Sequence, residues 1–318
     1  CHQLMTEAGY VKPGDVVFGT DSHTTTYGCV GAFSSGIGYT EMASILGTGT
    51  MWIKVPETIK VVINGKLPEG VMSKDIILRL IGDLGADGAT YRALEFSGTT
   101  VEDMSIASRM TIANMAIEAG GKAGLIEVDD VTRAYLDGRT ERPYTEYHSD
   151  ADATYAKVYE IDAASIVPTV SFPHLPSNTR PAAEARDVKI DQAVIGSCTN
   201  GRIADMRQAA DVLRGRTVHP DVRCIVIPAT QAVYRQCMEE GLMDVFLDAN
   251  CAVSTPTCGP CLGGYMGILA AGERAIATTN RNFVGRMGDP TSEVYLSSPA
   301  IAAASAVLGH IGLPEDLD

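Results

Sequence analysis

Apolar segments alternate with amphipathic segments through the final third of the chain, and this alternation is the feature that most constrains the fold. The elements predicted from it are strands over 192–196, 223–228 and 275–279 and helices over 203–213, 231–240, 264–271 and 298–308. Strands and helices that alternate in this way form parallel sheets covered on both faces. The sequence therefore predicts an α/β fold.

The residues before this alternation contain two predicted boundaries. Val55-Pro56 interrupts the pattern just before an apolar strand over 58–64, and a polar, loop-like stretch over 139–153 precedes Ile161. The domains predicted from these boundaries are 1–58, 59–162 and 163–318. The elements predicted within the first two segments are strands over 15–20 and 58–64 and helices over 40–46, 74–82 and 107–119.

Composition and charge narrow the class of protein. The chain has 318 residues, of which 45% are hydrophobic, and this is enough to bury the cores of two or three domains. The formal net charge of -14 argues against nucleic acid or an anionic membrane as a partner. We also expect no membrane span and no signal peptide, since apolar runs are short and the chain opens with Cys1-His2-Gln3-Leu4. The eight scattered cysteines predict a reducing cytoplasm.

Polar residues that could bind a ligand or take part in catalysis follow several of the predicted strands. Asp21-Ser22-His23, Cys198, the pair Cys258 and Cys261, and Asn280-Arg281 all stand in this position. In open α/β sheets, ligands bind outside the carboxyl ends of the strands. The sequence therefore predicts that these groups face one cleft.

The tetrapeptide Cys258-Gly-Pro-Cys261 is compatible with three kinds of chemistry. It matches the dithiol of thioredoxin-like oxidoreductases, although Thr257 precedes it and no compact thioredoxin-like domain surrounds it. With Cys251 as a further ligand it could form a structural zinc site. If Cys198 converges on the pair, three thiols could hold an iron–sulfur cluster and leave one iron open. The motif alone leaves the three readings open.

Other single residues have both an ordinary and a functional interpretation. Arg281 and Arg286 could be surface charges, but two arginines around a glycine also form a good clamp for carboxylates. Asn114 and Glu118 are four apart and share a helix face. Glu118 precedes Gly120, in a last helical turn where the helix dipole disfavours a carboxylate, so helix stability does not explain it.

Taken together, the motifs resemble the aconitase superfamily, and within it the family of isopropylmalate dehydratase large subunits. The matching segments, in the order of the family, are Cys1-His2-Gln3, Gly19-Thr20-Asp21-Ser22-His23-Thr24, 111–118, 196–200, 258–263 and 280–286. The resemblance implies an aconitase-type fold, with three-layer α/β/α domains around a central iron–sulfur cluster. It further implies that the first domain is truncated at its N-terminus and that the swivelling domain of the family is missing.

The resemblance also assigns roles to single residues. It implies that the ligands of a [4Fe–4S] cluster are Cys198, Cys258 and Cys261, and that the asparagines lying against the cluster are Asn114 and Asn280. The catalytic residues that it implies are His2, Asp21, His23 and Glu118. The substrate-binding residues that it implies are Ser22, Arg281 and Arg286.

The implied reaction is reversible dehydration of a 2-hydroxy dicarboxylic acid followed by rehydration at the neighbouring carbon. For isopropylmalate this is a hydro-lyase step of leucine biosynthesis. Homoaconitase, 2-methylmalate dehydratase and dimethylmalate dehydratase share the chemistry and stay open as alternatives. We expect a separate small subunit to carry the swivelling domain, and we expect this chain to be inactive without it.

Overall fold

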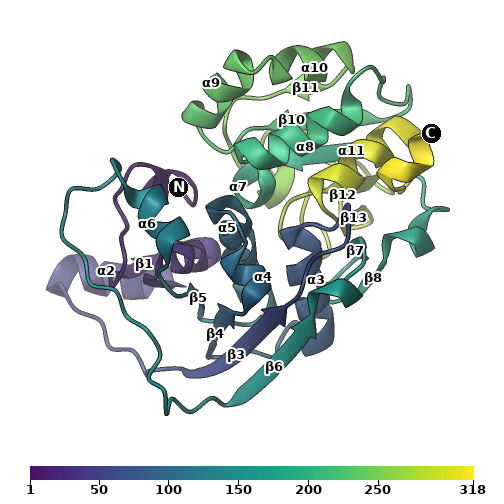
Figure 1. The fold of residues 1–318 in the computed structure, drawn as a ribbon. Helices are drawn as coiled ribbons and strands as arrows, with labels where there is room; N and C mark the ends of the chain where they lie inside the picture. Colours follow the sequence, from purple (N-terminus) through teal and green to yellow (C-terminus); the bar gives the residue numbers. More distant parts are fainter. The chain divides into compact units, whose positions relative to one another are not determined.

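The computed structural model describes residues 1–318, which form two compact units. The first unit contains residues 1–68 and 84–165, and the second contains residues 69–83 and 166–318 (Figure 1). Three separate sheets are present, of two, four and seven strands. The three segments predicted from sequence each contain one of these sheets. The first two segments lie in one compact unit, except for residues 69–83, which belong to the second unit.

The second unit is built on a seven-stranded sheet in the order β11-β10-β9-β12-β13-β7-β8. Its strands are β7 (Thr169–Ser171), β8 (Thr179–Pro181), β9 (Gln192–Gly196), β10 (Arg223–Ile227), β11 (Ala252–Val253), β12 (Arg274–Ala277) and β13 (Glu293–Leu296). The five strands from β11 to β13 are parallel, whereas β7 and β8 join antiparallel at one edge. The carboxyl ends of the five parallel strands therefore lie along one edge of the sheet.

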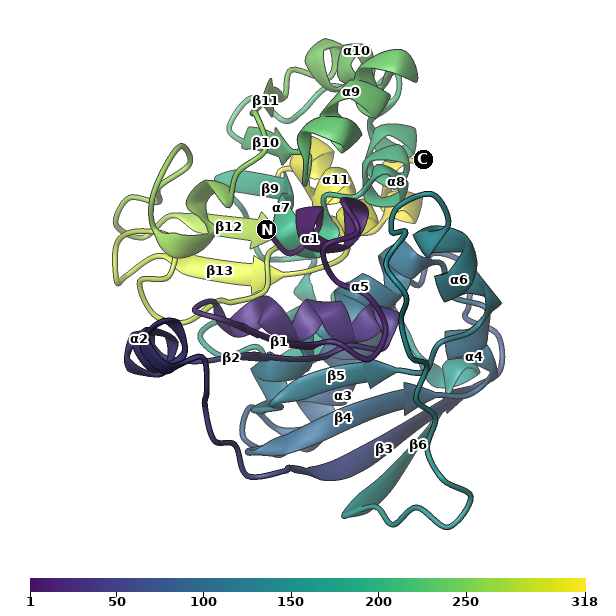
Figure 2. The same ribbon diagram turned by 90° about the vertical axis from the view of Figure 1, so that its left-hand side faces the viewer.

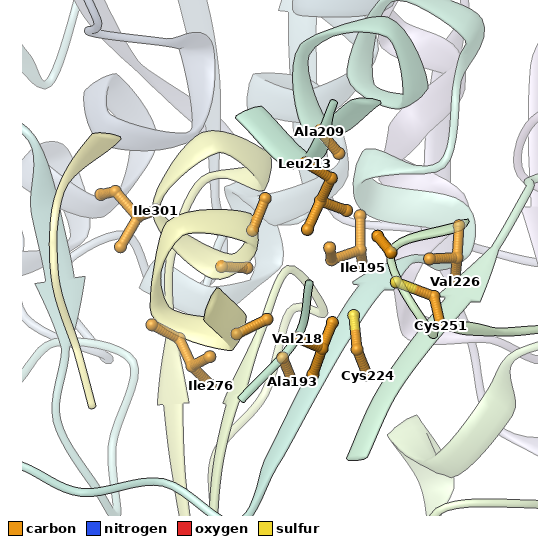
Figure 3. Close-up of a cluster of buried hydrophobic side chains, with 14 of the residues drawn as sticks. Ala193, Ile195, Ala209, Leu213, Val218, Cys224, Val226, Cys251, Ile276 and Ile301 are labelled. Carbon is orange, nitrogen blue, oxygen red and sulfur yellow. The ribbon is translucent and has the colours of Figure 1, made fainter. Parts of the chain in front are cut away.

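The second unit contains six helices. They are α3 (Ser73–Leu84, all but its last residue in this unit), α7 (Ser197–Asn200), α8 (Ile203–Leu213), α9 (Gln231–Glu239), α10 (Leu242–Asp248) and α11 (Pro299–Leu308), with 3-10 turns η4 (Ala182–Ala185), η5 (Gly259–Leu262) and η6 (Pro314–Leu317). Helices α8 and α11 pack on each other and on β9. Figure 3 shows the resulting core, which includes Ala193 and Ile195 of β9, Leu213 of α8 and Ile301 of α11.

One predicted helix is wrong, because residues 264–271 form no helix. Gly267 has a φ of +86°, and a side chain there would collide with Ile225 of β10. Tyr265 also has a positive φ, of 65°. This glycine-rich segment lies directly against the sheet, where a helix with its side chains would not fit. The sequence predictions likewise contained neither α10 nor β13.

The first unit contains the other two sheets. Strands β1 (Val16–Gly19) and β2 (Phe33–Gly36) form a parallel pair. The four-stranded sheet has the order β5-β4-β3-β6, with β3 (Glu57–Asn64), β4 (Arg92–Ser97), β5 (Ala123–Ile126) and β6 (Lys157–Asp162). All of its neighbours are parallel, and Figure 2 shows the four strands side by side.

The helical elements of the first unit are short. They are α1 (Leu4–Glu7), η1 (Ser22–Val30), α2 (Tyr39–Thr48), α4 (Thr99–Glu102), α5 (Ile106–Asn114), η2 (Met115–Ala119), α6 (Asp130–Leu136) and η3 (Ala163–Ser165). The helix predicted over 107–119 is thus an α-helix that tightens into a 3-10 turn after Asn114. In neither unit is there a helix with the length and apolar character needed to cross a bilayer.

Two neighbouring residues of α10 test how much the core of the second unit contributes to stability. Phe246 is fully buried in the core, whereas Leu247 is 60% exposed. We expect Phe246→Ala to lower the free energy of unfolding by about 3–5 kcal/mol, because it opens a cavity in a packed core. Leu247→Ala should change it by about 0.5 kcal/mol or less. Urea unfolding followed by circular dichroism measures both, and similar losses in the two variants would contradict the packing described here.

Candidate active site

Cys198 stands in a tight turn at the carboxyl end of β9. Gly196 has a φ of +119°, and a Cβ at this position would lie 2.0 Å from the carbonyl oxygen of Ile227 on β10. Only glycine can approach the neighbouring strand so closely. Ser197 follows with a φ of 66°, and the short helix α7 then begins. The turn leaves Cys198 partly exposed at the carboxyl edge of the sheet.

Cys258 and Cys261 are presented by the 3-10 turn η5, which follows β11. Cys258 caps the start of this turn and is exposed, while Cys261 lies in the turn and is buried. Pro260 stands in the first positions of the turn, where its missing N–H needs no partner. The two cysteines are therefore fixed at the same edge of the sheet as Cys198.

The three thiols, here called the cysteine group, are close enough to influence one another. Burial raises the pKa of Cys198 to about 12, and the charges of Cys261 and Cys258 add to this increase. Burial also raises the pKa of Cys261, although the charges of Arg286 and Arg281 partly oppose it. Two of the three cysteines therefore stay protonated thiols near neutral pH when no cation is bound.

Asn280 connects two members of the cysteine group. It follows β12, the strand beside β9, and it is buried. Its Oδ1 accepts a hydrogen bond from the Cys261 thiol at 3.5 Å, and its Nδ2 lies 3.9 Å from the Cys198 sulfur. The same Nδ2 donates to the Thr199 hydroxyl at 2.9 Å. The structure therefore brings Cys198, Cys261 and Asn280 together.

Arg286 and Arg281 lie in the loop after Asn280. Both are partly buried, and both influence Cys261 through their charges. The Nε atom of Arg286 is buried and has no hydrogen-bond partner. The Arg281 guanidinium lies over the ring of Phe283, at 5.9 Å from its centroid. An unsatisfied guanidinium N–H beside the cysteine group is suited to bind an anionic ligand.

Two charged residues near the cysteine group were missed by the sequence analysis. Arg202 is buried and donates from Nη2 to the Cys198 carbonyl oxygen at 2.9 Å. Lys74 is fully buried and donates to backbone carbonyls of residues 278 and 279. Lys74 follows Ser73 in the first turn of α3, where a lysine reads as an ordinary surface residue, and nothing local in the sequence indicates its burial.

A separate group of polar side chains, here called the histidine group, lies in the first unit. It consists of His2, Asp21, His23 and Glu118, and all except Asp21 are buried. His2 Nε2 lies 3.0 Å from Asp21 Oδ1, and the same oxygen accepts the backbone N–H of His23 at 2.8 Å. His23 Nε2 lies 2.7 Å from Glu118 Oε1. The structure therefore joins all four residues in one hydrogen-bonded chain.

The histidine group has distinct protonation preferences. Hydrogen bonds from His2 and His23 hold the pKa of Asp21 well below its ordinary range, so Asp21 is a carboxylate. Burial lowers the pKa of His2 below 6.5, although Asp21 partly opposes this effect. The native chain thus favours an ionised Asp21 beside a neutral His2. A carboxylate that orients an imidazole is a common arrangement in acid–base catalysis.

Ser22 and Asn114 were the other site residues predicted in this part of the chain. Ser22 begins η1 directly after Asp21 and lines a surface cavity of about 500 Å³. Asn114 ends α5 and is fully buried, and its Nδ2 donates to the Thr26 hydroxyl at 2.9 Å. Thr25 donates to the carbonyl oxygen of Asn114, so Thr25 and Thr26 of η1 together hold this residue in place.

The alternative readings of the Cys-Gly-Pro-Cys motif find little support. The raised pKa of Cys261 is the opposite of what thiol exchange requires. No group of three or more histidine, cysteine, aspartate or glutamate side chains is placed to hold a single metal ion. Cys251, the further zinc ligand considered, instead lies with Cys224 in the buried core of the second unit (Figure 3). Cysteine thiolates are the ligands of iron–sulfur clusters, and the cysteine group offers three of them near one another.

The fold and the two side-chain groups define a class of protein. It is an α/β chain with three grouped thiols at the carboxyl edge of a parallel sheet, together with a buried histidine–carboxylate group. The model of the aconitase family (aconitate hydratase) matches residues 1–185 and 176–309. The chain therefore belongs to the aconitase family. Membership in this family implies an iron–sulfur cluster.

Individual relatives agree with this assignment. The chain is 62% identical to a 3-isopropylmalate dehydratase large subunit of Syntrophus aciditrophicus. The 316 aligned residues cover 99% of this chain and 75% of the relative. It is 60% identical to the protein of the same name from Halothermothrix orenii, with the same coverage. The crystal structure of aconitase X from Thermococcus kodakaraensis has a TM-score of 0.51 over 87% of this chain and 64% of that chain. At 12% identity, this last similarity shows the fold alone.

The depressed pKa of His2 predicts how stability depends on pH. Below pH 6.5 the unfolded chain binds a proton at this residue more readily than the native chain, so acidification favours unfolding. His2→Gln removes this contribution. We expect the melting temperature of the variant to fall less steeply than that of the wild type as the pH decreases from about 7 to about 5. Above this window the two profiles should run parallel, which provides an internal control. Parallel profiles throughout the range would contradict the inferred burial of a neutral His2.

Proposed function

We propose that this chain is the large subunit of a 3-isopropylmalate dehydratase. The reaction is the reversible conversion of 2-isopropylmalate to 3-isopropylmalate through isopropylmaleate, in leucine biosynthesis. The observation that carries the proposal is identity of about 60% over 99% of the chain to relatives of that name. The grouping of Cys198, Cys258 and Cys261 supports it, since this chemistry needs a metal centre rather than a redox dithiol.

The cofactor that we propose is a [4Fe–4S] cluster with three protein ligands. Cys198, Cys258 and Cys261 are the ligands that the chain offers, and Asn280 would lie against the bound group because it already contacts two of them. When bound, such a cluster supplies an iron without a protein ligand, which acts as a Lewis acid toward a hydroxyl group. Iron-bound thiols are deprotonated, so Arg286 and Arg281 are well placed to stabilise the resulting charge.

The chain's own residues have two tasks in this proposal. Arg286 and Arg281 bind a carboxylate of the substrate, and the unsatisfied Nε of Arg286 is the donor that lacks a protein partner. Ser22 is the substrate-binding residue that we propose in the first unit. The histidine group handles the proton that leaves with the hydroxyl. His23 and Glu118 hold a proton between Nε2 and Oε1, and a group that donates this proton makes water rather than hydroxide the leaving species.

The partner that we propose is a small subunit. The relatives are named large subunits, and the chain spans about three quarters of their length. Homoaconitase, 2-methylmalate dehydratase and dimethylmalate dehydratase share the reaction type and are the alternatives within this class. The proposed compartment is the cytoplasm, which is supported by eight cysteines that are all free thiols.

Cluster binding provides the first test of the proposal. The reduced chain is reconstituted anaerobically with iron and sulfide, and iron content and visible absorption are measured. We expect Cys198→Ser to lose the cluster, because one of the three ligands is missing. Cys1→Ser, which changes an exposed cysteine outside the cysteine group, should retain it. Equal iron content in the two variants would show that the ligand set is wrong. Turnover of isopropylmalate, homocitrate and citramalate with the small subunit then identifies the substrate.

The role of Glu118 can be tested separately from cluster binding. Glu118→Gln keeps the shape of the side chain and can still hydrogen-bond His23, but it cannot exchange a proton. We expect kcat with the small subunit to fall by about 10²–10⁴-fold, as is typical when a general acid or base is removed. Iron content should match that of the wild type. A variant with nearly normal kcat would exclude Glu118 from proton transfer.

A further inference from the structure

Lys74 is a buried cation that has no carboxylate within ion-pair distance. It is the second residue of α3 and is 0% exposed. Its Nζ donates to the carbonyl oxygens of Thr278 at 2.8 Å and Thr279 at 2.6 Å. Burial of an ammonium group is unfavourable unless nearby negative charge compensates it. The partners that compensate this charge have to be sought among the groups around it.

Two carboxyl groups act on Lys74, and each is already engaged elsewhere. Asp75 accepts the backbone N–H groups of Met72 and Thr169, and Asp205 accepts the side chain of Asn200. Burial raises the pKa of Asp75 to about 7 and also raises that of Asp205, so both are weakened as permanent anions. Both carboxyl groups are thus committed to other donors, and neither forms an ion pair with Lys74.

The cysteine group would supply further negative charge once it binds metal. Burial lowers the pKa of Lys74 to about 7, and Asp205, Cys261 and Cys198 are the largest influences that oppose this decrease. Thiols that bind metal are deprotonated outright, so they become permanent anions when a cluster is present. Cys198 and Cys261, two of the three proposed ligands, would then act on the Lys74 ammonium with a full charge.

Lys74 also holds the backbone that carries Asn280. Thr278 and Thr279 follow the last residue of β12 and immediately precede Asn280 and Arg281. By binding both carbonyl groups, the ammonium fixes the direction in which the chain leaves the sheet. Asn280 contacts Cys198 and Cys261 from this position.

We propose that Lys74 is a positioning residue that offsets the charge of the metal-bound thiolates and anchors the backbone before Asn280. The charge role rests on the proposed function, since it requires a cluster, whereas the anchoring role does not. A fixed positive charge stabilises the more electron-rich state of a nearby redox centre. Removal of the charge should therefore move the reduction potential of the cluster to more negative values.

Three substitutions separate the charge from the anchor. Lys74→Met removes both the charge and the hydrogen bonds. Lys74→Gln removes the charge but keeps a donor, and Lys74→Arg keeps the charge. Lys189→Met is the matched control, because Lys189 is the other lysine of the same unit and is exposed.

The first measurement is the midpoint potential of the reconstituted cluster. We expect Lys74→Met and Lys74→Gln to shift the reduction equilibrium at least tenfold toward the oxidised form, which is about 59 mV more negative for a one-electron couple. Lys74→Arg and Lys189→Met should stay close to the wild type. If Lys74→Met does not fold, the comparison of the Gln and Arg variants gives the same information. Equal potentials in the Gln and Arg variants would overturn the charge role.

The second measurement is amide hydrogen exchange in the metal-free chain. We expect exchange over residues 278–286 to be at least tenfold faster in Lys74→Met than in Lys189→Met, with unchanged rates in β9 and β10. Unchanged exchange over 278–286 would overturn the anchoring role. A wild-type chain that takes up no iron would overturn the proposed function and the charge role with it, and exchange would then decide the anchoring role alone.

Discussion

The hydroxyl group of Thr278 connects the carboxyl end of β12 to that of β9 by hydrogen bonds. The position of the cysteine group depends on these two strand ends. The hydroxyl group accepts the backbone N–H of Gly196 at 2.8 Å and donates to the carbonyl oxygen of the same residue at 3.1 Å. Because β9 and β12 are parallel neighbours, their carboxyl ends meet at one edge of the sheet. Cys198 follows one of these ends and Asn280 follows the other. A single buried threonine side chain therefore keeps the two segments of the site in contact.

The same region contains buried polar atoms that have no hydrogen-bond partner, which is energetically unfavourable. Ser197 Oγ, Thr279 Oγ1 and Arg286 Nε are buried without hydrogen-bond partners, although each residue lies beside or within a segment of the site. A buried polar atom without a partner costs roughly 1–3 kcal/mol, and natural proteins keep such atoms mainly where function requires them. All three lie in the segments 196–200 and 278–286 that carry Cys198, Asn280 and the two arginines, which indicates a region organised for a ligand.

The regular elements could be predicted from sequence, but the side-chain partnerships could not. Strands β9, β10 and β12 and helices α8, α9 and α11 follow the predicted ranges, because apolar periodicity reports directly on a buried face. The segment 264–271 departs from prediction because its periodicity resembles a helix, while Gly267 has a positive φ and lies against Ile225 of the sheet. The contact between His23 and Glu118 joins residues 95 positions apart, and only the family resemblance placed them together. Lys74 donates a hydrogen bond to residue 278, which is 204 positions away, and no local sequence pattern predicts such a contact.

The protonation states of the cysteine group and of Lys74 depend on each other. Without a bound cation, burial favours the neutral form of each group: it raises the pKa of Cys198 and Cys261 and lowers that of Lys74. Such thiols are poor nucleophiles, which explains why a Cys-Gly-Pro-Cys sequence here does not imply redox exchange. Metal binding requires the thiolate form and is therefore coupled to proton release. Once thiolates are present, they favour the charged form of Lys74, so the buried ammonium and the metal-bound thiolates stabilise each other.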